Sequence, residues 1–204
     1  MPTKSQQFCC GSNEAGFSLI EMTIVVAIFL LVAAIGIPIL SSTLNRLKLR
    51  GAAQQLSELY QEARMRAVQD DSYYEVLLSA DSKQAYVDLS GNGAASLLTL
   101  QLPATMSLNN AGAPAGLDKQ TLGFDSVQTE TSLMFDHDGV SRPGLAWSSR
   151  GFSCQRGSAT SVCQAGKGWL QYVRRDGNPA TYAAVSVSPA GRVRVWSYEG
   201  GVWR

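Results

Sequence analysis

Residues 16–21 are Gly-Phe-Ser-Leu-Ile-Glu, and an apolar run follows them from Met22 to Leu40. This run contains no charged residue. About 19 positions at about 1.5 Å rise per residue make a helix long enough to cross the hydrocarbon core of a bilayer. The sequence therefore predicts one membrane-spanning helix near its beginning.

Glu21 lies at the rim of this apolar helix, where a carboxylate is costly in lipid and is expected to have a functional partner. One interpretation is that its side chain extends to the headgroups at the membrane edge. The other is that it pairs with a cation inside an apolar bundle of helices. The free or methylated amino terminus of an adjacent subunit is such a cation.

The stretch at 16–21 with its apolar helix resembles the class III signal sequence of type IV pilins and of the pseudopilins of type II secretion. The resemblance implies that a prepilin peptidase cleaves after Gly16 and that the new terminus, Phe17, is N-methylated. It also implies that Glu21 helps to register each subunit against its neighbour in a filament. Residues 1–16 are then a leader peptide that is removed.

The distribution of cations and the resemblance predict opposite orientations. Lys4 is the only cation of the leader, whereas Arg46, Lys48 and Arg50 follow the apolar run. The cation count alone places the far end in the cytoplasm. The resemblance instead implies a single-pass protein of the bacterial inner membrane with a periplasmic head, and we adopt that orientation as the expectation.

The helical pattern continues beyond the apolar run to about Gln69, where Asp70 follows. Apolar residues recur there at spacings of three and four, which indicates one face to be covered. They are Leu49, Ala52, Ala53, Leu56, Leu59, Tyr60, Ala63 and Ala67. Pro38 lies within the helix and is expected to kink or loosen it, because proline removes a backbone hydrogen bond. Pilins often have a proline at the matching place.

Strand-like runs follow the helix. They cover residues 73–78, 85–89, 97–102, 132–135, 169–174, 182–187 and 192–196, and the last three alternate as half-buried antiparallel strands do. Residues 109–116 are predicted to be a surface loop. The fold class is α+β, with a long N-terminal helix packed on an antiparallel sheet. The expected organisation is leader 1–16, membrane or filament-core helix 17–40, amphipathic continuation 41–70 and β-rich head 71–204.

A helix followed by an all-β head is similar to the H-type pseudopilin and FimT/FimU minor pilin family. The phrase Ser-Pro-Ala-Gly-Arg-Val-Arg-Val at 188–195 also resembles the final hairpin of that family. The resemblance implies a minor filament subunit whose partners are other pilins or pseudopilins, the prepilin peptidase and the inner membrane.

The four cysteines fall into two groups. Cys9 and Cys10 lie in the leader, whereas Cys154 and Cys163 enclose eight residues of the expected periplasmic head. An oxidising compartment favours a disulfide between Cys154 and Cys163. Two unpaired thiols are the alternative, and a metal site is disfavoured because the chain has a single histidine.

That histidine, His137, lies between Asp136 and Asp138 and is interpreted as part of a polar turn. The sequence has no nucleophile elbow, P-loop or dinucleotide-binding fingerprint. We therefore expect no enzyme, no cofactor, no metal and no small-molecule substrate.

Charge is divided unevenly along the chain. Residues 140–204 contain nine cations and two acids, a net charge of +7, whereas the whole chain is +1. Gly191-Arg192-Val193-Arg194 resembles the DNA-contacting segment of FimT-type minor pilins, and Arg192 and Arg194 would share one face of a strand. Arginines suit phosphates, and aromatic side chains suit bases. The aromatic residues interleaved with these cations are Trp147, Trp169, Tyr172, Trp196 and Trp203. Ordinary solvated arginines are the alternative.

The sequence thus leaves two functions open. The first is a minor pseudopilin of a type II secretion system. The alternative is a FimT/FimU-type minor pilin of a type IV pilus that binds extracellular DNA for uptake. Both begin with the same membrane-held subunit.

Overall fold

The computed structural model describes residues 18–79, 83–89, 98–124, 126–128, 145–157, 160–165, 168–177 and 180–204. At positions 38–39, 88–89, 126–128, 155–157 and 160–165 it describes the backbone alone. The chain divides into two compact units, one through Thr43 and the other from Leu44 to Arg204.

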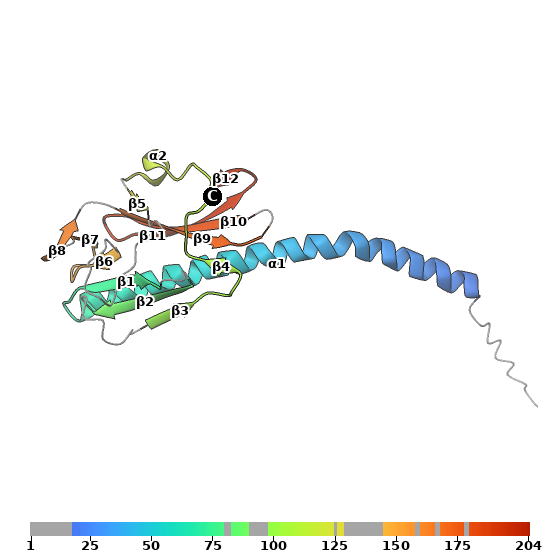
Figure 1. Ribbon diagram of the computed structural model, residues 1–204, viewed down its shortest axis with the longest axis horizontal. Coiled ribbons are helices and arrows are strands. Elements are labelled where there is room, and N and C mark those ends of the chain that lie inside the picture. Colours follow the sequence, from blue (N-terminus) through green and yellow to red (C-terminus); the bar gives the residue numbers. More distant parts are fainter. Residues whose placement is uncertain are drawn as a thin grey trace, which may run out of the picture. The chain divides into compact units, whose positions relative to one another are not determined.

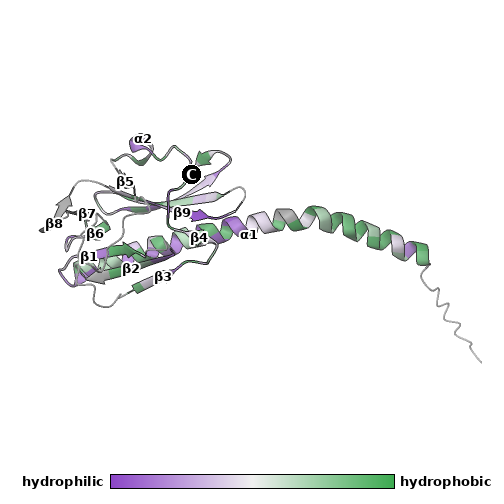
Figure 2. Ribbon diagram, in the orientation of Figure 1, coloured by the Kyte–Doolittle hydropathy of each residue, from purple (hydrophilic) through white to green (hydrophobic). Residues whose placement is uncertain are grey.

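A single long helix, α1, runs from Leu19 to Gln69 and belongs to both units. Its first part is mostly apolar, with Glu21 in the first turn, whereas the part beyond Thr43 mixes apolar and polar residues (Figure 2). The helix is continuous through position 38, so a proline there does not end it. The kink expected at Pro38 stays a prediction.

The helix ends as the sequence predicts, at Gln69. Asp71 adopts a left-handed backbone with φ of 48°, and the Ser72 amide donates to the Ala67 carbonyl at 3.1 Å. This geometry closes a helix C-terminus by satisfying one of its free carbonyl groups. The Tyr74 hydroxyl donates to the Asp70 carboxylate at 2.5 Å and joins the end of the helix to the first strand.

The predicted apolar stripe of the second half of α1 is confirmed. All eight of its residues, from Leu49 to Ala67, are buried, and Leu56 is fully covered. The physical reason is the helical period, because side chains three and four residues apart lie on one face.

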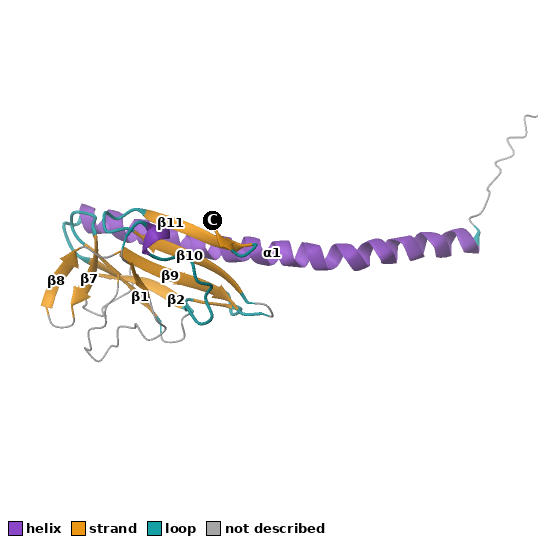
Figure 3. Cartoon of the chain, turned by 90° about the horizontal axis from the view of Figure 1, so that it is seen from above, coloured by secondary structure: helices purple, strands orange, loops and turns teal. Residues whose placement is uncertain are grey.

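Two mainly antiparallel sheets accompany this half of the helix (Figures 1 and 3). The first has the order β3-β2-β1-β6-β7-β8. Its strands are β1 (Tyr74–Leu78), β2 (Gln84–Leu89), β3 (Leu98–Gln101), β6 (Leu145–Trp147), β7 (Ser153–Gly157) and β8 (Thr160–Ala165). The antiparallel α+β fold class is therefore confirmed.

The second sheet has the order β12-β11-β10-β9-β4, and β5 pairs in parallel with β9. Its strands are β4 (Met106–Ser107), β5 (Ser126–Gln128), β9 (Gly168–Arg175), β10 (Thr181–Val187), β11 (Val193–Glu199) and β12 (Val202–Trp203). A four-residue helix, α2 (Lys119–Leu122), precedes β5.

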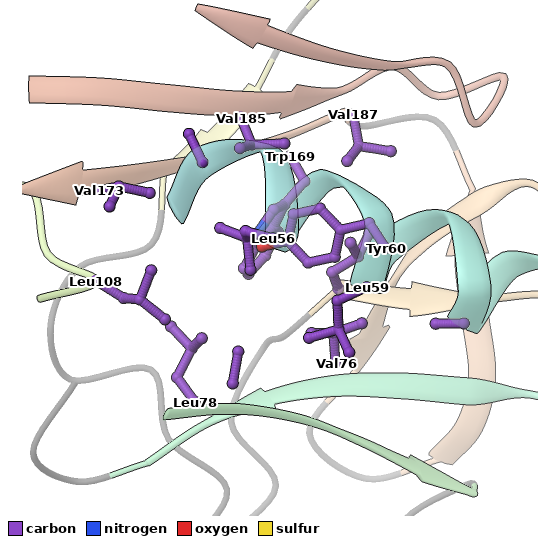
Figure 4. Packing of buried hydrophobic residues seen from close by; sticks show 14 of the residues in the cluster. Leu56, Leu59, Tyr60, Val76, Leu78, Leu108, Trp169, Val173, Val185 and Val187 are labelled. Atoms are coloured by element: carbon purple, nitrogen blue, oxygen red, sulfur yellow. The ribbon is translucent and has the colours of Figure 1, made fainter. Parts of the chain in front are cut away.

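The main core joins the helix to both sheets. Figure 4 shows Leu56, Leu59 and Tyr60 of α1 between Val185 and Val187 of the second sheet and Val76 of the first. The stripe on α1 is therefore covered from two sides. Burial of this apolar surface is the main force that holds the two sheets to the helix.

The second sheet differs from the expectation of half-buried strands. Residues 168–173 of β9 and 182–187 of β10 are buried on both faces. The helix covers the inner face, and the outer face holds a second apolar cluster that contains Leu170, Tyr172, Ala184 and Trp196. The alternation expected for these two strands was therefore wrong, because the sheet is a middle layer.

The predicted loop 109–116 lies on the surface and also helps to cover this outer face. The Tyr182 hydroxyl donates to the Ala111 carbonyl at 2.9 Å, and Leu117 is buried in the second cluster. The Trp203 Nε1 donates to the Pro114 carbonyl at 3.4 Å. Aromatic residues of β10 and β12 thus hold the loop against the sheet.

Tyr60 is wholly buried in the main core, and this burial raises the pKa of its hydroxyl above the usual value. The unfolded chain ionises tyrosine near pH 10, whereas folded Tyr60 keeps its proton. Ionisation of Tyr60 in the unfolded chain therefore leaves the free energy of unfolding unchanged below about pH 10 and lowers it by about 1.4 kcal/mol per pH unit above that. We expect Tyr60→Phe to lower the alkaline slope of the unfolding free energy by about that amount. Urea unfolding between about pH 10 and 11.5 measures the slope, and an unchanged slope in the variant would contradict this.

Candidate functional site

The first part of α1 is an uncovered apolar surface. Every large apolar side chain that the structure describes from Leu19 to Leu47 is exposed. By length and composition α1 can cross a membrane, and its most apolar window has no cover from the rest of the described chain. An apolar surface of this size is not expected to stay in water, so lipid or other subunits are expected to cover it.

Glu21 stands in the first turn of α1, and its side chain is exposed. The Glu21 amide donates to the Ser18 carbonyl at 3.0 Å, which begins the helix. A carboxylate in a first turn is favoured by the partial positive charge of the helix N-terminus. Gly16 and Phe17, the predicted processing residues, lie outside the described residues, as does His137.

Arg64 connects the helix to one turn of each sheet, a role that the sequence reasoning missed. Its Nε donates to the Gly151 carbonyl at 2.9 Å, and its Nη1 donates to the Gly191 carbonyl at 3.1 Å. Its guanidinium carbon lies 5.9 Å from the centre of the Trp147 ring. Arg64 is therefore the contact shared by α1, the β6–β7 turn and the β10–β11 turn.

The two turns have the same hydrogen bonds. In each, the serine carbonyl accepts from the glycine amide three positions later, and the serine amide donates to the carbonyl four positions later. The serine hydroxyl accepts from the amide of that later residue, Phe152 in one turn and Arg192 in the other. The turns are Ser148–Phe152 and Ser188–Arg192, which we name the twin turns. Each places a glycine at positive φ, 74° at Gly151 and 83° at Gly191. The shared Ser-x-x-Gly spacing is the sequence signal that would have indicated both.

We expect Arg64→Met to lower the free energy of unfolding by about 2 to 4 kcal/mol, because two backbone carbonyls lose a charged donor. Arg66→Met is the matched control. Arg66 forms a half-exposed pair with Glu62 at 3.0 Å, which is worth at most about 1 kcal/mol. Urea unfolding of the full chain in detergent micelles, followed by tryptophan fluorescence, compares the two. Equal losses would contradict the role of Arg64.

Arg192 and Arg194 are both exposed. Arg192 lies just before β11, and Arg194 is the second residue of that strand. The guanidinium carbon of Arg194 lies 3.7 Å from the centre of the Trp196 ring. The interleaved aromatic residues, in contrast, are buried: Trp147, Trp169, Tyr172, Trp196 and Trp203. The expectation that these rings are available for base stacking was wrong, because they fill the two apolar cores.

Cys154 is disulfide-bonded. It begins the pairing of β7 with β8, where Cys154 faces Ala165 and Arg156 faces Cys163 across the two strands. The backbone thus brings the predicted partner, Cys163, onto the adjacent strand. The side chain of Cys163 lies outside the described residues. Among the described residues, no group of three or more His, Cys, Asp or Glu side chains is placed to hold a metal ion.

Comparison with known proteins decides how the N-terminal segment is classified. Residues 11–37 match the family model of the prokaryotic N-terminal methylation motif. This chain carries the methylation motif. The match confirms the pilin-type resemblance predicted from residues 16–21, and it places Gly16, Phe17 and Glu21 inside the methylation motif.

Solved structures similar to the chain include the type IV minor pilin FimU of Pseudomonas aeruginosa. It is 17% identical, with a TM-score of 0.44, and the alignment covers 78% of this chain and 95% of FimU. Another is the minor pseudopilin EpsH of the type II secretion system of Vibrio cholerae, 14% identical, with a TM-score of 0.45 and coverage of 74% and 97%. No curated protein sequence matches the chain.

Proposed function

We propose that this protein is a minor pseudopilin of a type II secretion system, a structural subunit and not an enzyme. The observation that carries the proposal is the methylation motif at 11–37 continuing into an apolar helical surface without cover. A helix that is apolar on all sides needs lipid before assembly and neighbouring helices afterwards. A filament drawn from a membrane supplies both.

Processing follows from the same motif. A prepilin peptidase cleaves after Gly16, and the amine of Phe17 becomes methylated. Glu21 then pairs with the terminal amine of an adjacent subunit, because a carboxylate in an apolar bundle is stable only beside a cation. Other pseudopilins and the peptidase are therefore the partners.

The location that we propose is the bacterial inner membrane, with one pass and a periplasmic head. The disulfide at Cys154 supports an oxidising compartment for that part of the chain. We assign Cys163 as its partner, because β7 and β8 are adjacent and antiparallel. Peptide mapping without reduction tests the assignment, and a Cys154 peptide linked to another cysteine would refute it.

The proposed function is tested by expressing the full chain with and without a prepilin peptidase. With the peptidase, we expect the chain in membranes and in mechanically sheared filaments, trimmed at Gly16. Without it, the chain keeps its leader and stays out of filaments. A trimmed chain that never enters filaments, in cells that make them, would refute the structural role.

The alternative function is that of a FimT/FimU-type minor pilin that binds extracellular DNA. The exposure of Arg192 and Arg194 favours it, whereas the burial of the nearby tryptophans limits it to contacts with phosphates. Binding by a few arginines to phosphates is weak and falls steeply with added salt.

We expect any binding of duplex DNA to be lost when Arg192 and Arg194 are both replaced by alanine. The matched control replaces Arg46 and Lys48 by alanine. Both side chains are also exposed, and their replacement removes the same amount of charge. Fluorescence anisotropy across salt concentrations measures the affinity. Binding that is independent of salt, or that both double variants weaken equally, would eliminate the DNA-binding function.

A further inference from the structure

Strand β11 pairs with β10 on one side, and on its other side, among the described strands, β12 pairs with its second half alone. β12 pairs with Tyr198 and Glu199, and Arg204 exchanges two backbone hydrogen bonds with Ser197, at 2.9 and 3.0 Å. In the part of the chain that the structure describes, no strand pairs with the outer side of residues 193–196.

The direction of the free backbone groups follows from Ser197. Its amide and carbonyl point away from β10, since both bond to Arg204. Residues two apart on an antiparallel strand point the same way. Val193 and Val195 therefore present their amides and carbonyls outward, while Arg194, opposite Ser186, directs its own backbone groups to β10.

This row of outward groups is held in place. The side chains of Val193 and Val195 pack against the main core. The strand begins at the twin turn Ser188–Arg192, which Arg64 and the Ser153 hydroxyl hold, the latter donating to the Ser188 carbonyl at 2.7 Å. A fixed row of alternating donors and acceptors is the template that an added β-strand requires.

The charge around the row is positive. Arg192 and Arg194 are exposed at its beginning, and Arg204 is exposed beside Ser197. Glu199 is the acid that β11 itself carries, and it lies at the covered end. An incoming strand with acidic side chains would meet these arginines, which gives the site a preference for acidic segments.

We propose that the outer side of residues 193–196 binds an extended acidic segment of a neighbouring filament subunit as an added β-strand. The identity of the neighbour rests on the proposed function, whereas the binding of a strand does not. Main-chain hydrogen bonds to Val193 and Val195 hold the segment, and its acidic side chains pair with Arg192 and Arg194. The chain shows the same mode of pairing where β12 adds to the second half of β11.

The first test uses the full chain in detergent micelles and a fluorescent eight-residue peptide of alternating Val and Glu. Val195→Pro removes one outward amide and keeps the pairing of Arg194 and Trp196 with β10, because proline is tolerated at a sheet border. Val195→Thr keeps the amide and is the matched control. We expect Val195→Pro to weaken binding at least about tenfold and Val195→Thr to leave it unchanged.

Variants of the peptide keep the proposal testable if Val195→Pro fails to fold. A peptide N-methylated at alternate residues cannot donate to the row, and a Val-Lys peptide meets the arginines with like charge. Each should bind the unchanged protein at least about tenfold more weakly. No saturable binding of the Val-Glu peptide up to about 1 mM would overturn the proposal. Peptide binding that is altered neither by Val195→Pro nor by N-methylation of the peptide would also overturn it. The same holds if duplex DNA displaces the peptide and this displacement persists in the Val195→Pro protein.

The second test separates the strand from the proposed function in cells. We expect the Val195→Pro chain to be trimmed at Gly16 and to reach the membrane at the normal level. It should be depleted at least about tenfold from sheared filaments, whereas Val195→Thr is retained. If the Val195→Pro chain is trimmed and assembles normally, the proposal that the added strand comes from a neighbouring subunit is overturned. Failure of the unchanged chain to be trimmed or assembled would instead refute the proposed function, and the peptide test would still decide the strand.

Discussion

Replacing Gly16 by valine is expected to keep the leader on the chain and to abolish its entry into filaments. In the proposed processing, the bond after Gly16 enters the active site of a peptidase at the membrane surface, and a branched side chain beside that bond would obstruct its approach. Without cleavage, no amine is released at Phe17 to pair with Glu21. The apolar helix would then be preceded by 16 further residues, among them Lys4 and Glu14.

Intact-mass measurement of the chain extracted from membranes reads this result directly. The unchanged chain should have lost residues 1–16 and gained one methyl group, and the Gly16→Val chain should keep its full mass. Gly11→Val is the matched control, because it alters a leader glycine away from the cleavage bond and should be trimmed normally. Normal trimming of Gly16→Val, or a leader that persists in the unchanged chain beside an active peptidase, would contradict the proposed cleavage after Gly16.

Replacing Gly191 by alanine is expected to lower the free energy of unfolding by about 3 to 5 kcal/mol, a large part of the roughly 5 to 15 kcal/mol by which domains are stable. A Cβ at this position would lie 2.4 Å from the Gly151 carbonyl oxygen and 3.0 Å from the Arg64 guanidinium carbon. The backbone there has φ of 83°, which disfavours any side chain. The twin turns must therefore separate, and Arg64 loses its place between them.

Gly200→Ala is the matched control for this result. Gly200 also has positive φ, 59°, but its Cβ would meet nothing within 4 Å. We expect a loss of about 1 kcal/mol, the cost of the left-handed backbone alone. Urea unfolding of the full chain in micelles compares the two variants, and equal losses would show that the close approach at Gly191 is unimportant.

The Gly191 result also bears on the Gly-Arg-Val-Arg segment. Its glycine is required by the packing of two turns, so the segment has a structural reason to exist without DNA. Arg192 and Arg194 have exposed side chains, and we expect each alanine variant to lose no more than about 1 kcal/mol. Any DNA binding must therefore be judged on the arginines and never on the glycine.

Sequence patterns with a short period predicted the elements well. The helix ends at Gln69 as expected, and the runs at 73–78, 85–89, 97–102, 169–174 and 182–187 correspond to β1, β2, β3, β9 and β10. The run predicted at 192–196 corresponds to β11, which begins one residue later and extends to Glu199. The predicted strand at 132–135 lies outside the described residues. Strands β4, β5, β6 and β12 were not predicted, because two or three residues are too few to show a period. Strands β7 and β8 were not predicted, because their sequences are largely polar and show no clear apolar alternation.

The sequence by itself determined the methylation motif, the uncovered apolar helix and the stripe from Leu49 to Ala67, because each depends on neighbours along the chain. Only the tertiary structure decided which side of each strand is covered, since that depends on which layers meet. It buried both faces of β9 and β10, withdrew the tryptophans from solvent and brought Gly151 and Gly191 to Arg64. It also left half of β11 with an open border, which no local pattern encodes, because the border is defined by the absence of a distant partner among the described strands.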